Sequence, residues 1–186
     1  MMVDKERLIC EKLIDMMEEK SFFDIKVKEF AEFAGIGRST FYLYFDSLYD
    51  VLQQIEDEYL AGMVDESTMA QKARGLEMEK FNAAFVAKVS YIEQNKRLLR
   101  VLLGENGDPS FSARLVNRYK RIARKSFDGM GEYSPVEVEM LAEYSSAGYL
   151  QVLKWWLEHE DDIDLCDMML SMERYTIALR NGAKAL

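Results

Sequence analysis

The stretch Ala31–Phe45, AEFAGIGRSTFYLYF, decides the fold of this chain. The apolar residues that lead into it have the i, i+3, i+4, i+7 spacing of one face of a helix: Val27, Phe30, Ala31 and Ala34. Gly35 then suits the left-handed corner that ends a helix. Gly37 can cap a second helix, predicted over 38–45. Two short helices joined by so tight a turn form a helix-turn-helix.

The second helix of this motif carries side chains suited to DNA. In a helix-turn-helix the second helix lies in the major groove, with its N-terminal residues at the base edges. Arg38 has the reach and the forked donors for a guanine edge, while Phe41 and Phe45, one turn apart, can anchor the helix to the core. The other candidate contacts, to bases or phosphates, are Ser39, Thr40, Tyr42 and Tyr44, with Lys26 and Lys28 at the start of the preceding helix. The same pattern also fits a generic corner between two helices.

The rest of the chain shows helical periodicity as well. It has 186 residues, is 49% hydrophobic and contains only 2 prolines, and its apolar residues recur every three or four positions. We therefore predict an all-α fold of two domains, a helix-turn-helix domain over 1–66 that includes the start of a connecting fourth helix, and a larger helical domain over 67–186. The predicted helices are 4–20, 27–34, 38–45, 47–66, 76–95, 97–103, 109–127, 135–160 and 163–181.

The charge of the chain argues against a nucleic-acid partner. The net charge is -9, whereas contacts with phosphates require local positive charge. Residues 21–50 contain three basic and five acidic side chains, a net charge of -2. If this region binds DNA, few phosphates are neutralised, and we predict modest affinity with a shallow salt dependence.

Residue types needed for other functions are sparse. The two cysteines, Cys10 and Cys166, form no motif and are predicted to be free thiols in a reducing cytoplasm. His159 is the only histidine, so no zinc site is expected. We find no nucleophile–base–acid grouping, Walker loop or dinucleotide fingerprint, and predict no enzyme activity, cofactor or metal. We also find no secretory leader and no apolar run long enough to span a bilayer, and predict no membrane partner.

The segment Ile25–Val51, IKVKEFAEFAGIGRSTFYLYFDSLYDV, closely resembles the DNA-binding domain of the TetR family of bacterial transcriptional regulators. Within it, VKEFAEFAGI resembles the second helix and turn of the family, STFYLYF its recognition helix, and YDV the start of its fourth helix. A weaker resemblance to the ligand-binding and dimerisation part continues in LLRVLLGENGDPSF and GYLQVLKWWLEHE. The resemblance implies a nine-helix TetR-like fold whose first three helices bind double-stranded DNA, and a homodimer formed through the last two long helices.

Two positions depart from the pattern of the family. Members commonly carry a lysine that meets a phosphate where Leu48 stands, and a threonine where Lys26 stands. Lys26 could replace a lost phosphate contact, but Leu48 cannot make one.

Together these features predict a homodimeric one-component regulator, a repressor, that binds a palindromic operator and is released by a small apolar or amphipathic effector. Aromatic residues of the larger domain are the candidates for lining the effector site, although core and dimer interface account for most such residues: Phe85, Phe111, Tyr119, Tyr149 and Trp155. The alternative is a TetR-like protein that has lost DNA binding and acts as a ligand-sensing or protein-binding partner of another regulator. Leu48 and the local charge of -2 motivate that alternative.

Overall fold

The computed structural model describes residues 2–63, 78–128 and 133–182. These residues form nine α-helices and one short 3-10 helix, with no strand among them, which confirms the predicted all-α class. The chain divides into two compact units. The first unit combines Met1–Gly62 with Arg97–Phe111, and the second combines Met63–Lys96 with Ser112–Leu186. The connector predicted at 67–75, with the proposed boundary at residue 66, lies outside the described residues.

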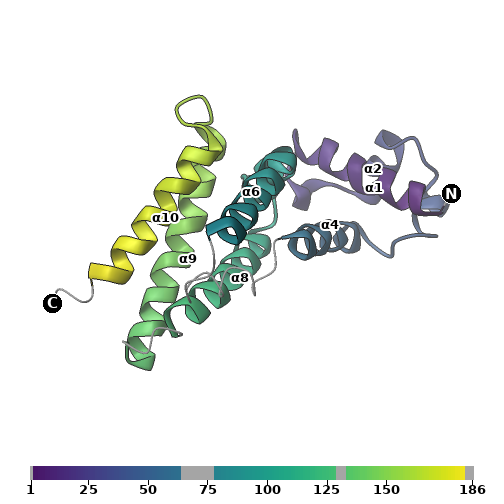
Figure 1. Ribbon diagram of the computed structural model, residues 1–186. Helices are drawn as coiled ribbons and strands as arrows, with labels where there is room; N and C mark the ends of the chain where they lie inside the picture. The colour runs from purple at the N-terminus through teal and green to yellow at the C-terminus, as the bar shows by residue number, and fades with distance from the viewer. Residues whose placement is uncertain (1, 64–77, 129–132, 183–186) are drawn as a thin grey trace. The chain divides into compact units, whose positions relative to one another are not determined.

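The first unit is built on four N-terminal helices, three of which are labelled in Figure 1: α1 (Met2–Met17), α2 (Val27–Phe33), α3 (Arg38–Phe41) and α4 (Leu48–Gly62). A 3-10 helix, η1 (Phe22–Asp24), follows α1. Helix α1 contacts α2 and α4, and α2 contacts α3. The side chains buried between these helices are apolar and include Ile9, Leu13, Met17, Phe30, Phe41, Val51 and Leu52. This burial supplies the main driving force for folding the unit.

The second unit contains the long helices of the chain. They are α6 (Met78–Gln94), α8 (Pro109–Asp128, from Ser112 onward), α9 (Pro135–Glu158) and α10 (Leu165–Gly182). Helix α10 packs against α6 and α9, and Figure 1 shows α9 and α10 side by side. A capping box opens α9: Ser134 Oγ accepts from the Glu137 N–H at 3.3 Å, and Glu137 Oε2 accepts from the Ser134 N–H at 2.8 Å. Ser134 and Glu137, three residues apart with Pro135 between them, have the sequence spacing of this motif.

The turn between α2 and α3 is a Schellman motif. Gly35 has a φ of 66°, the left-handed conformation that was predicted for it. Its N–H donates to Glu32 O at 3.2 Å, and the Ile36 N–H donates to Ala31 O at 3.0 Å. These two bonds satisfy carbonyls that the end of α2 would otherwise leave without partners. Because the pattern ends α2 sharply, α3 starts after only four intervening residues.

The two glycines of the turn are expected to respond differently to alanine. Gly35→Ala places a Cβ on a left-handed residue and should lower the free energy of unfolding by about 1–2 kcal/mol. Gly37 has ordinary angles (φ -72°, ψ 145°), and an added Cβ would meet only Ser39 Oγ and Thr40 Oγ1 at 3.6 Å. Gly37→Ala should therefore change stability by less than about 0.5 kcal/mol. Urea unfolding followed by far-UV circular dichroism compares them, and equal losses would contradict the assignment of the corner to Gly35.

Helix α3 is shorter than predicted. The prediction extended it to Phe45, but it ends at Phe41. The Leu43 N–H bonds to Thr40 O at 3.2 Å and the Tyr44 N–H to Phe41 O at 3.0 Å, so the chain tightens into i→i+3 bonds after the first turn. Phe45 nevertheless stays buried, 7% exposed, because this tighter turn still directs its ring toward the core.

A later part of the chain, the 97–111 segment, packs within the first unit. It contains most of α7 (Lys96–Leu103) and the turn that leads into α8. The Phe22 N–H donates to Asn106 O at 2.9 Å, and the Tyr49 hydroxyl donates to Asp108 Oδ2 at 3.1 Å. The rings of Tyr59 and Phe111 meet edge to face, with centroids 5.8 Å apart. The sequence analysis placed these residues with the larger domain, because their long-range partners leave no local pattern.

Asp108 caps α8, and it is expected to make the free energy of unfolding depend on pH in the acid range. It is buried, and burial alone would raise its pKa, but hydrogen bonds from the Ser110 N–H (2.8 Å), the Ser110 hydroxyl (2.7 Å) and Tyr49 outweigh burial and leave the pKa below its usual value. A lowered pKa in the folded state means that Asp108 stabilises the fold above the unfolded pKa and loses this effect as the pH falls through the folded one.

The test is the substitution Asp108→Asn, which removes the charge and keeps the shape. It should cost about 1–2 kcal/mol at pH 7, the scale of hydrogen bonds to a charged group. The difference from the unsubstituted protein should shrink below about pH 4, the usual range for an aspartate. Glu105→Gln, in the same turn but exposed, is the matched control and should change little. Urea unfolding at pH 7 and pH 3 measures both, and a difference that stays constant with pH would contradict the prediction.

Candidate nucleic-acid interface and effector region

The inner side of α3 is fixed in the core by aromatic contacts. Phe41 is 0% exposed, and its ring meets that of Phe30 edge to face at 5.8 Å and that of Phe45 at 6.3 Å. The outer side is open, with Leu43 78% and Tyr42 54% exposed. Helix α3 is therefore anchored in the core on one side, while the residues on the other side are exposed to solvent.

The structure places all seven candidate DNA-contacting residues in the first unit, at the start of α2 and along α3 and the turn that follows it. Those classed as exposed are Lys26, Lys28, Arg38, Ser39 and Tyr42, while Thr40 and Tyr44 are partly buried. Arg38 is the first residue of α3, and Lys26 is the N-cap of α2. None of the three cations forms an ion pair with any residue that the structure describes. Their charges are therefore available to a partner.

Leu48, the position where the family commonly has lysine, is part of the core. It is the first residue of α4 and only 6% exposed. The preceding Ser47 caps the helix through its hydroxyl, which accepts from the Asp50 N–H at 3.2 Å. The leucine that stands in place of the lysine therefore packs in the core of this chain, which the sequence alone did not reveal. A lysine at position 48 would have to extend its ammonium group to the surface past apolar neighbours.

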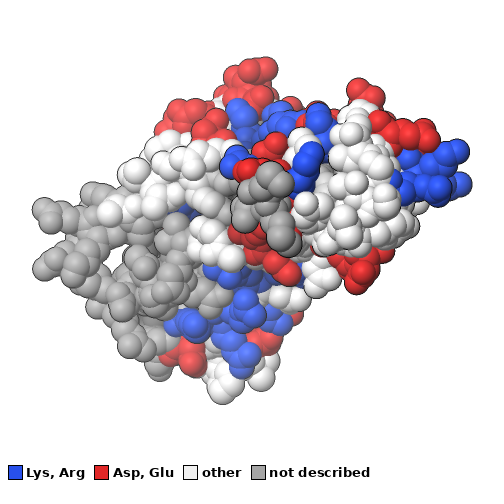
Figure 2. All heavy atoms as spheres, turned by 90° about the vertical axis from the view of Figure 1, so that its right-hand side faces the viewer, with Lys and Arg blue, Asp and Glu red and all other residues white. Residues whose placement is uncertain are grey.

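The surface charge is mixed. On the face shown in Figure 2, Lys and Arg side chains alternate with Asp and Glu, and no continuous basic surface covers that face. This agrees with the local charge of -2 counted over residues 21–50. With a net charge of -2, residues 21–50 can contact DNA only through a few positioned groups and not through a broad positive field.

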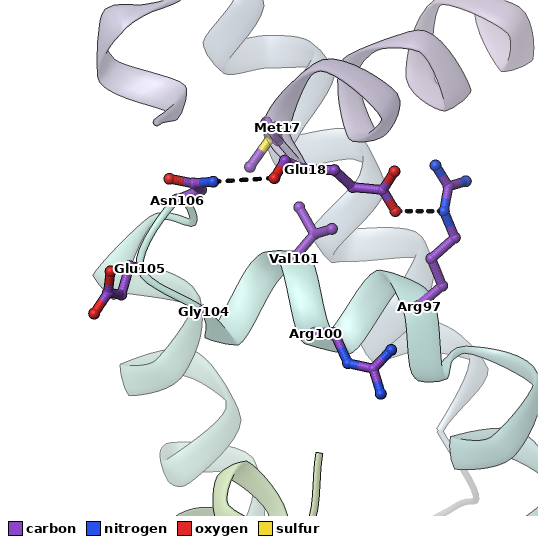
Figure 3. A pocket seen from close by; sticks show the side chains of 8 residues that line it. All are labelled: Met17, Glu18, Arg97, Arg100, Val101, Gly104, Glu105 and Asn106. Carbon is purple, nitrogen blue, oxygen red and sulfur yellow. Dashed lines mark hydrogen bonds and ion pairs between the residues drawn. The ribbon is translucent and has the colours of Figure 1, made fainter. Parts of the chain in front are cut away.

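A pocket lies in the first unit between the end of α1 and α7. Its volume is about 420 Å³, which is within the range of small-molecule sites. Figure 3 shows Met17 and Val101 on its apolar side and Arg97 joined to Glu18 across it. The complete lining is Met17, Glu18, Arg97, Arg100, Val101, Gly104, Glu105 and Asn106. None of the five candidate effector residues lines it.

Ion pairs hold α7 to α1 beside this pocket. Arg97 bonds to Glu18 Oε1 and to Asp15 Oδ1, both at 2.7 Å, and Lys12 bonds to Asp15 Oδ2 at 2.8 Å. These contacts lower the pKa of Asp15, chiefly through Lys12 and then Arg97, and Arg97 lowers the pKa of Glu18. The side chain of Arg97 is 57% exposed, so solvent screens the cluster and its main effect is on geometry.

The five candidate effector residues do not form one cluster. Tyr119 and Tyr149 are in contact within the second unit, with ring centroids 4.3 Å apart. Phe85 is partly buried on α6, whereas Phe111 belongs to the first unit, where it packs on Tyr59. Trp155 is 44% exposed. The structure thus separates one aromatic pair in the second unit from residues with other surroundings.

The chemically reactive residues outside these regions do not form a further site. Trp155 stacks on His159 at 4.6 Å, and His159 Nδ1 lies 2.8 Å from Trp155 O. Burial, with help from Glu58 and other carboxylates, raises the pKa of Cys10 to about 12, and Cys166 is exposed and free. In the described part of the chain, no group of three His, Cys, Asp or Glu side chains could hold a metal ion. No described helix is long and apolar enough to cross a membrane.

An all-α chain with a helix-turn-helix in one unit and long helices in a second has the architecture of a helix-turn-helix transcription regulator. Residues 79–177, more than half of the chain, match the family model TetR_C_8, which describes the C-terminal region of transcriptional regulators. The chain belongs to the TetR family of transcriptional regulators. This confirms the family suggested by the resemblance of residues 25–51. No curated protein matches the sequence.

Solved structures share the fold at low sequence identity. One is the dihydroxyacetone kinase operon activator DhaS, with a TM-score of 0.63, 16% identity, and coverage of 95% of this chain and 96% of that one. Another is FadR of Thermus thermophilus, a TetR-family repressor solved with lauroyl-CoA, with a TM-score of 0.56, 19% identity, and coverage of 92% and 93%. At these identities the likeness establishes the fold over nearly the whole chain.

Proposed function

We propose that this protein is a cytoplasmic, non-enzymatic, homodimeric regulator that binds a palindromic DNA site through α3 and is released from it by a small molecule. The observation that carries the proposal is α3 itself. Phe41 fixes its inner side, while Arg38, in its first turn, is exposed and has no ion pair to the described residues. An exposed guanidinium at the start of the second helix of such a motif is suited to a guanine edge.

We propose repression as the sign of regulation. One solved structure of this fold is named an activator and the other a repressor, so the fold serves both. Repression needs only that a bound dimer occupies the DNA, whereas activation needs a further contact with the transcription machinery. The exposed residues of α3 account for the first requirement.

The dimer is proposed to form through α9 and α10. Helix α9 exposes a row of large apolar side chains: Val136 (68%), Met140 (66%), Tyr144 (68%) and Trp155 (44%). Their spacing of four, four and eleven residues puts them on one face of the helix. Helix α10 adds Leu170 (41%) and Ile177 (40%), seven residues apart. Long exposed apolar faces mark interaction sites, and we expect an interface of the obligate kind, above about 2,000 Å² in total.

Gly148 marks the point of closest approach in this proposed interface. It lies near the middle of α9, four residues after Tyr144, and a Cβ built on it meets nothing within 4 Å. A glycine inside a helix costs about 1 kcal/mol relative to alanine. No contact within the described residues explains this cost, but a second helix crossing there would need the space that a missing side chain leaves.

Filling that space should weaken the dimer without harming the fold. Gly148→Leu adds a side chain that meets open space within one chain and favours the helix, but overpacks an interface by about 1–3 kcal/mol. We expect the dimer dissociation constant to rise at least about tenfold, while the unfolding of the separated chains is unchanged or improved. Sedimentation over a dilution series measures the constant, with Gly148→Ala as the smaller step. An unchanged constant for Gly148→Leu would remove Gly148 from the interface.

The effector is proposed to bind in the second unit and to act through linkage. A molecule that binds the DNA-free form more tightly than the DNA-bound form lowers DNA affinity, and DNA lowers its affinity by the same factor. FadR, with its bound lauroyl-CoA, shows that this fold accommodates an amphipathic ligand. We propose an amphipathic effector for this chain.

The direct test of the proposed function is a selection of bound sequences from random double-stranded DNA. We expect a palindromic site and modest affinity. We also expect a shallow dependence of the binding constant on salt, because the three basic side chains of residues 21–50 can neutralise only a few phosphates. The same site, titrated by fluorescence anisotropy, then serves for the variants considered in the Discussion. Recovery of no preferred sequence at low salt would contradict the proposal.

The alternative, a TetR-like protein without DNA binding, is favoured by one observation. Leu48 lies in the core at the position where the family commonly has a phosphate-binding lysine, and the surrounding region is acidic. If the selection recovers no site, we propose a role as a ligand-sensing or protein-binding partner of another regulator. In that case α9 and α10 should still form the dimer, because that proposal does not depend on α3.

A further inference from the structure

The interior of the second unit contains a cluster of polar aromatic and cationic side chains that the proposed function does not yet use. The cluster draws one residue from each of four helices. The rings of Tyr119 on α8 and Tyr149 on α9 lie 4.3 Å apart, tilted by 56°. Lys88 Nζ on α6 is 4.3 Å from the centroid of Tyr149 and 5.8 Å from that of Tyr119. The Tyr149 hydroxyl points at Met169 Sδ on α10, 2.9 Å away.

Tyr119 is the unusual member of this cluster. It is 7% exposed, and its hydroxyl has no partner of hydrogen-bond geometry among the described residues. Burial raises its pKa well above the ordinary value, and the neighbouring Tyr149 raises it further, so the group is a neutral phenol. A buried donor without an acceptor destabilises the fold. Such groups in native proteins call for an explanation, such as a ligand or an ordered water.

Arg118, the residue before Tyr119, also carries a buried donor without a hydrogen-bond partner in the described part of the chain. Arg118 Nε is buried and has no hydrogen-bond partner among the residues that the structure describes. Its Nη2 reaches Met63 O only at the long distance of 3.4 Å. Two successive residues of α8 therefore hold a buried N–H or O–H donor without an acceptor among the described residues, and Lys88 Nζ lies 5.8 Å from the ring of one of them, Tyr119. Two such buried donors, one of them on a guanidinium, favour an acceptor that carries negative charge.

We propose that this cluster is the head-group site of the effector, and that the effector is a carboxylate with an apolar body. The Tyr119 hydroxyl donates to the carboxylate, the charges of Lys88 and Arg118 balance it, and Tyr149 and Met169 contact the apolar body. The inference rests on the proposed function for the role of effector, but the binding itself can be tested separately. It excludes cationic ligands, which would add charge beside two cations.

The test compares sodium decanoate, 4-phenylbutyrate and 1-decanol on the full-length protein by isothermal titration calorimetry. Both carboxylates should bind at least about tenfold more tightly than the alcohol, as expected for hydrogen bonds to a charged group. A preference between decanoate and 4-phenylbutyrate tells whether the body is aliphatic or aromatic. Equal binding of decanoate and 1-decanol, or binding of none of the three, would overturn the proposal.

Tyr119→Phe gives the decisive signature, because it removes only the hydroxyl. Decanoate affinity should fall about 10-fold or more, with 1-decanol affinity unchanged. Without ligand, the melting temperature should stay the same or rise by about 2–4 °C, because a donor without an acceptor has been removed. A hydroxyl that is satisfied in the free protein, for instance by a buried water, predicts a lower melting temperature and unchanged decanoate affinity, and that result would overturn the proposal.

Tyr175→Phe is the matched control, since this phenol is 63% exposed on α10 and should leave decanoate binding unchanged. Titrations of DNA in the presence of decanoate distinguish binding of the carboxylate from release of the protein from DNA. If decanoate binds as expected but leaves DNA affinity unchanged, the carboxylate site stands and release by the effector fails. If DNA binding is specific but no carboxylate binds, the regulator stands and the proposed site is overturned.

Discussion

Phe41→Ala is expected to lower the free energy of unfolding of the first unit by about 3–5 kcal/mol. Phe41 is 0% exposed and its ring contacts those of Phe30, Tyr42 and Phe45, at centroid distances of 5.8, 5.3 and 6.3 Å. Alanine leaves a cavity among three aromatic neighbours that α3, a helix of one turn, cannot fill by shifting along its length. The stability of domains in general is only about 5–15 kcal/mol, so a loss of this size removes a large part of it.

Hydrogen exchange of the backbone amides of α2 and α3 is the measurement of choice for this variant. Both tryptophans, Trp155 and Trp156, belong to the second unit, so intrinsic fluorescence would not report on the first. Leu43→Ala is the control, because Leu43 is 78% exposed two residues away and should change protection by less than about 0.5 kcal/mol. Equal protection in Phe41→Ala and Leu43→Ala would contradict the packing described for α3.

Arg38→Ala is expected to weaken operator binding by about 1–3 kcal/mol for each half-site, which is about 5- to 150-fold for each of the two contacts that the dimer loses. The reason is the loss of a forked guanidinium contact with one base, which no neighbouring side chain can replace. Sequence preference should relax at one position per half-site and persist elsewhere. Anisotropy titrations on the selected operator and on its single-base variants measure both effects.

Arg38→Lys and Lys28→Ala separate base reading from charge. Arg38→Lys keeps the charge but loses the fork, so it should relax the same base position while leaving the salt dependence nearly unchanged. Lys28→Ala removes an exposed charge at the start of α2, so it should weaken all sequences alike and reduce the salt slope by about one unit per half-site. If Arg38→Ala also weakens all base variants equally, Arg38 contacts a phosphate and the base-reading role is wrong.

The sequence predicted those parts of the fold whose causes are local. The corner at Gly35 follows from one left-handed glycine and two backbone bonds, and the start of α9 follows from Ser134 and Glu137. The end of α3 was placed too late, because an apolar face at Phe41 and Phe45 is compatible both with a helix and with the tighter turn that the structure has. Spacing alone does not distinguish the two conformations.

The parts that escaped prediction depend on contacts between distant residues. Periodicity identifies the buried face of a helix but not its partner, so Phe111 and Tyr119 looked equivalent in sequence although Phe111 packs on Tyr59 and Tyr119 on Tyr149. The burial of Leu48 was missed for the same reason. The sequence could not reveal that the Tyr119 hydroxyl has no hydrogen-bond partner among the described residues, because this depends on which side chains the fold places around it.

The way in which the 97–111 segment completes the first unit limits how such regulators can be recombined. A helix-turn-helix fragment cut after α4 would lose three contacts: the Asn106 carbonyl that accepts from the Phe22 N–H, the Asp108 carboxylate that accepts from the Tyr49 hydroxyl, and the Phe111 ring that packs on Tyr59. Residues 1–62 alone therefore do not make up the complete first unit. A chimera that keeps the first unit intact must therefore also keep residues 97–111, which begin more than thirty residues after the end of α4.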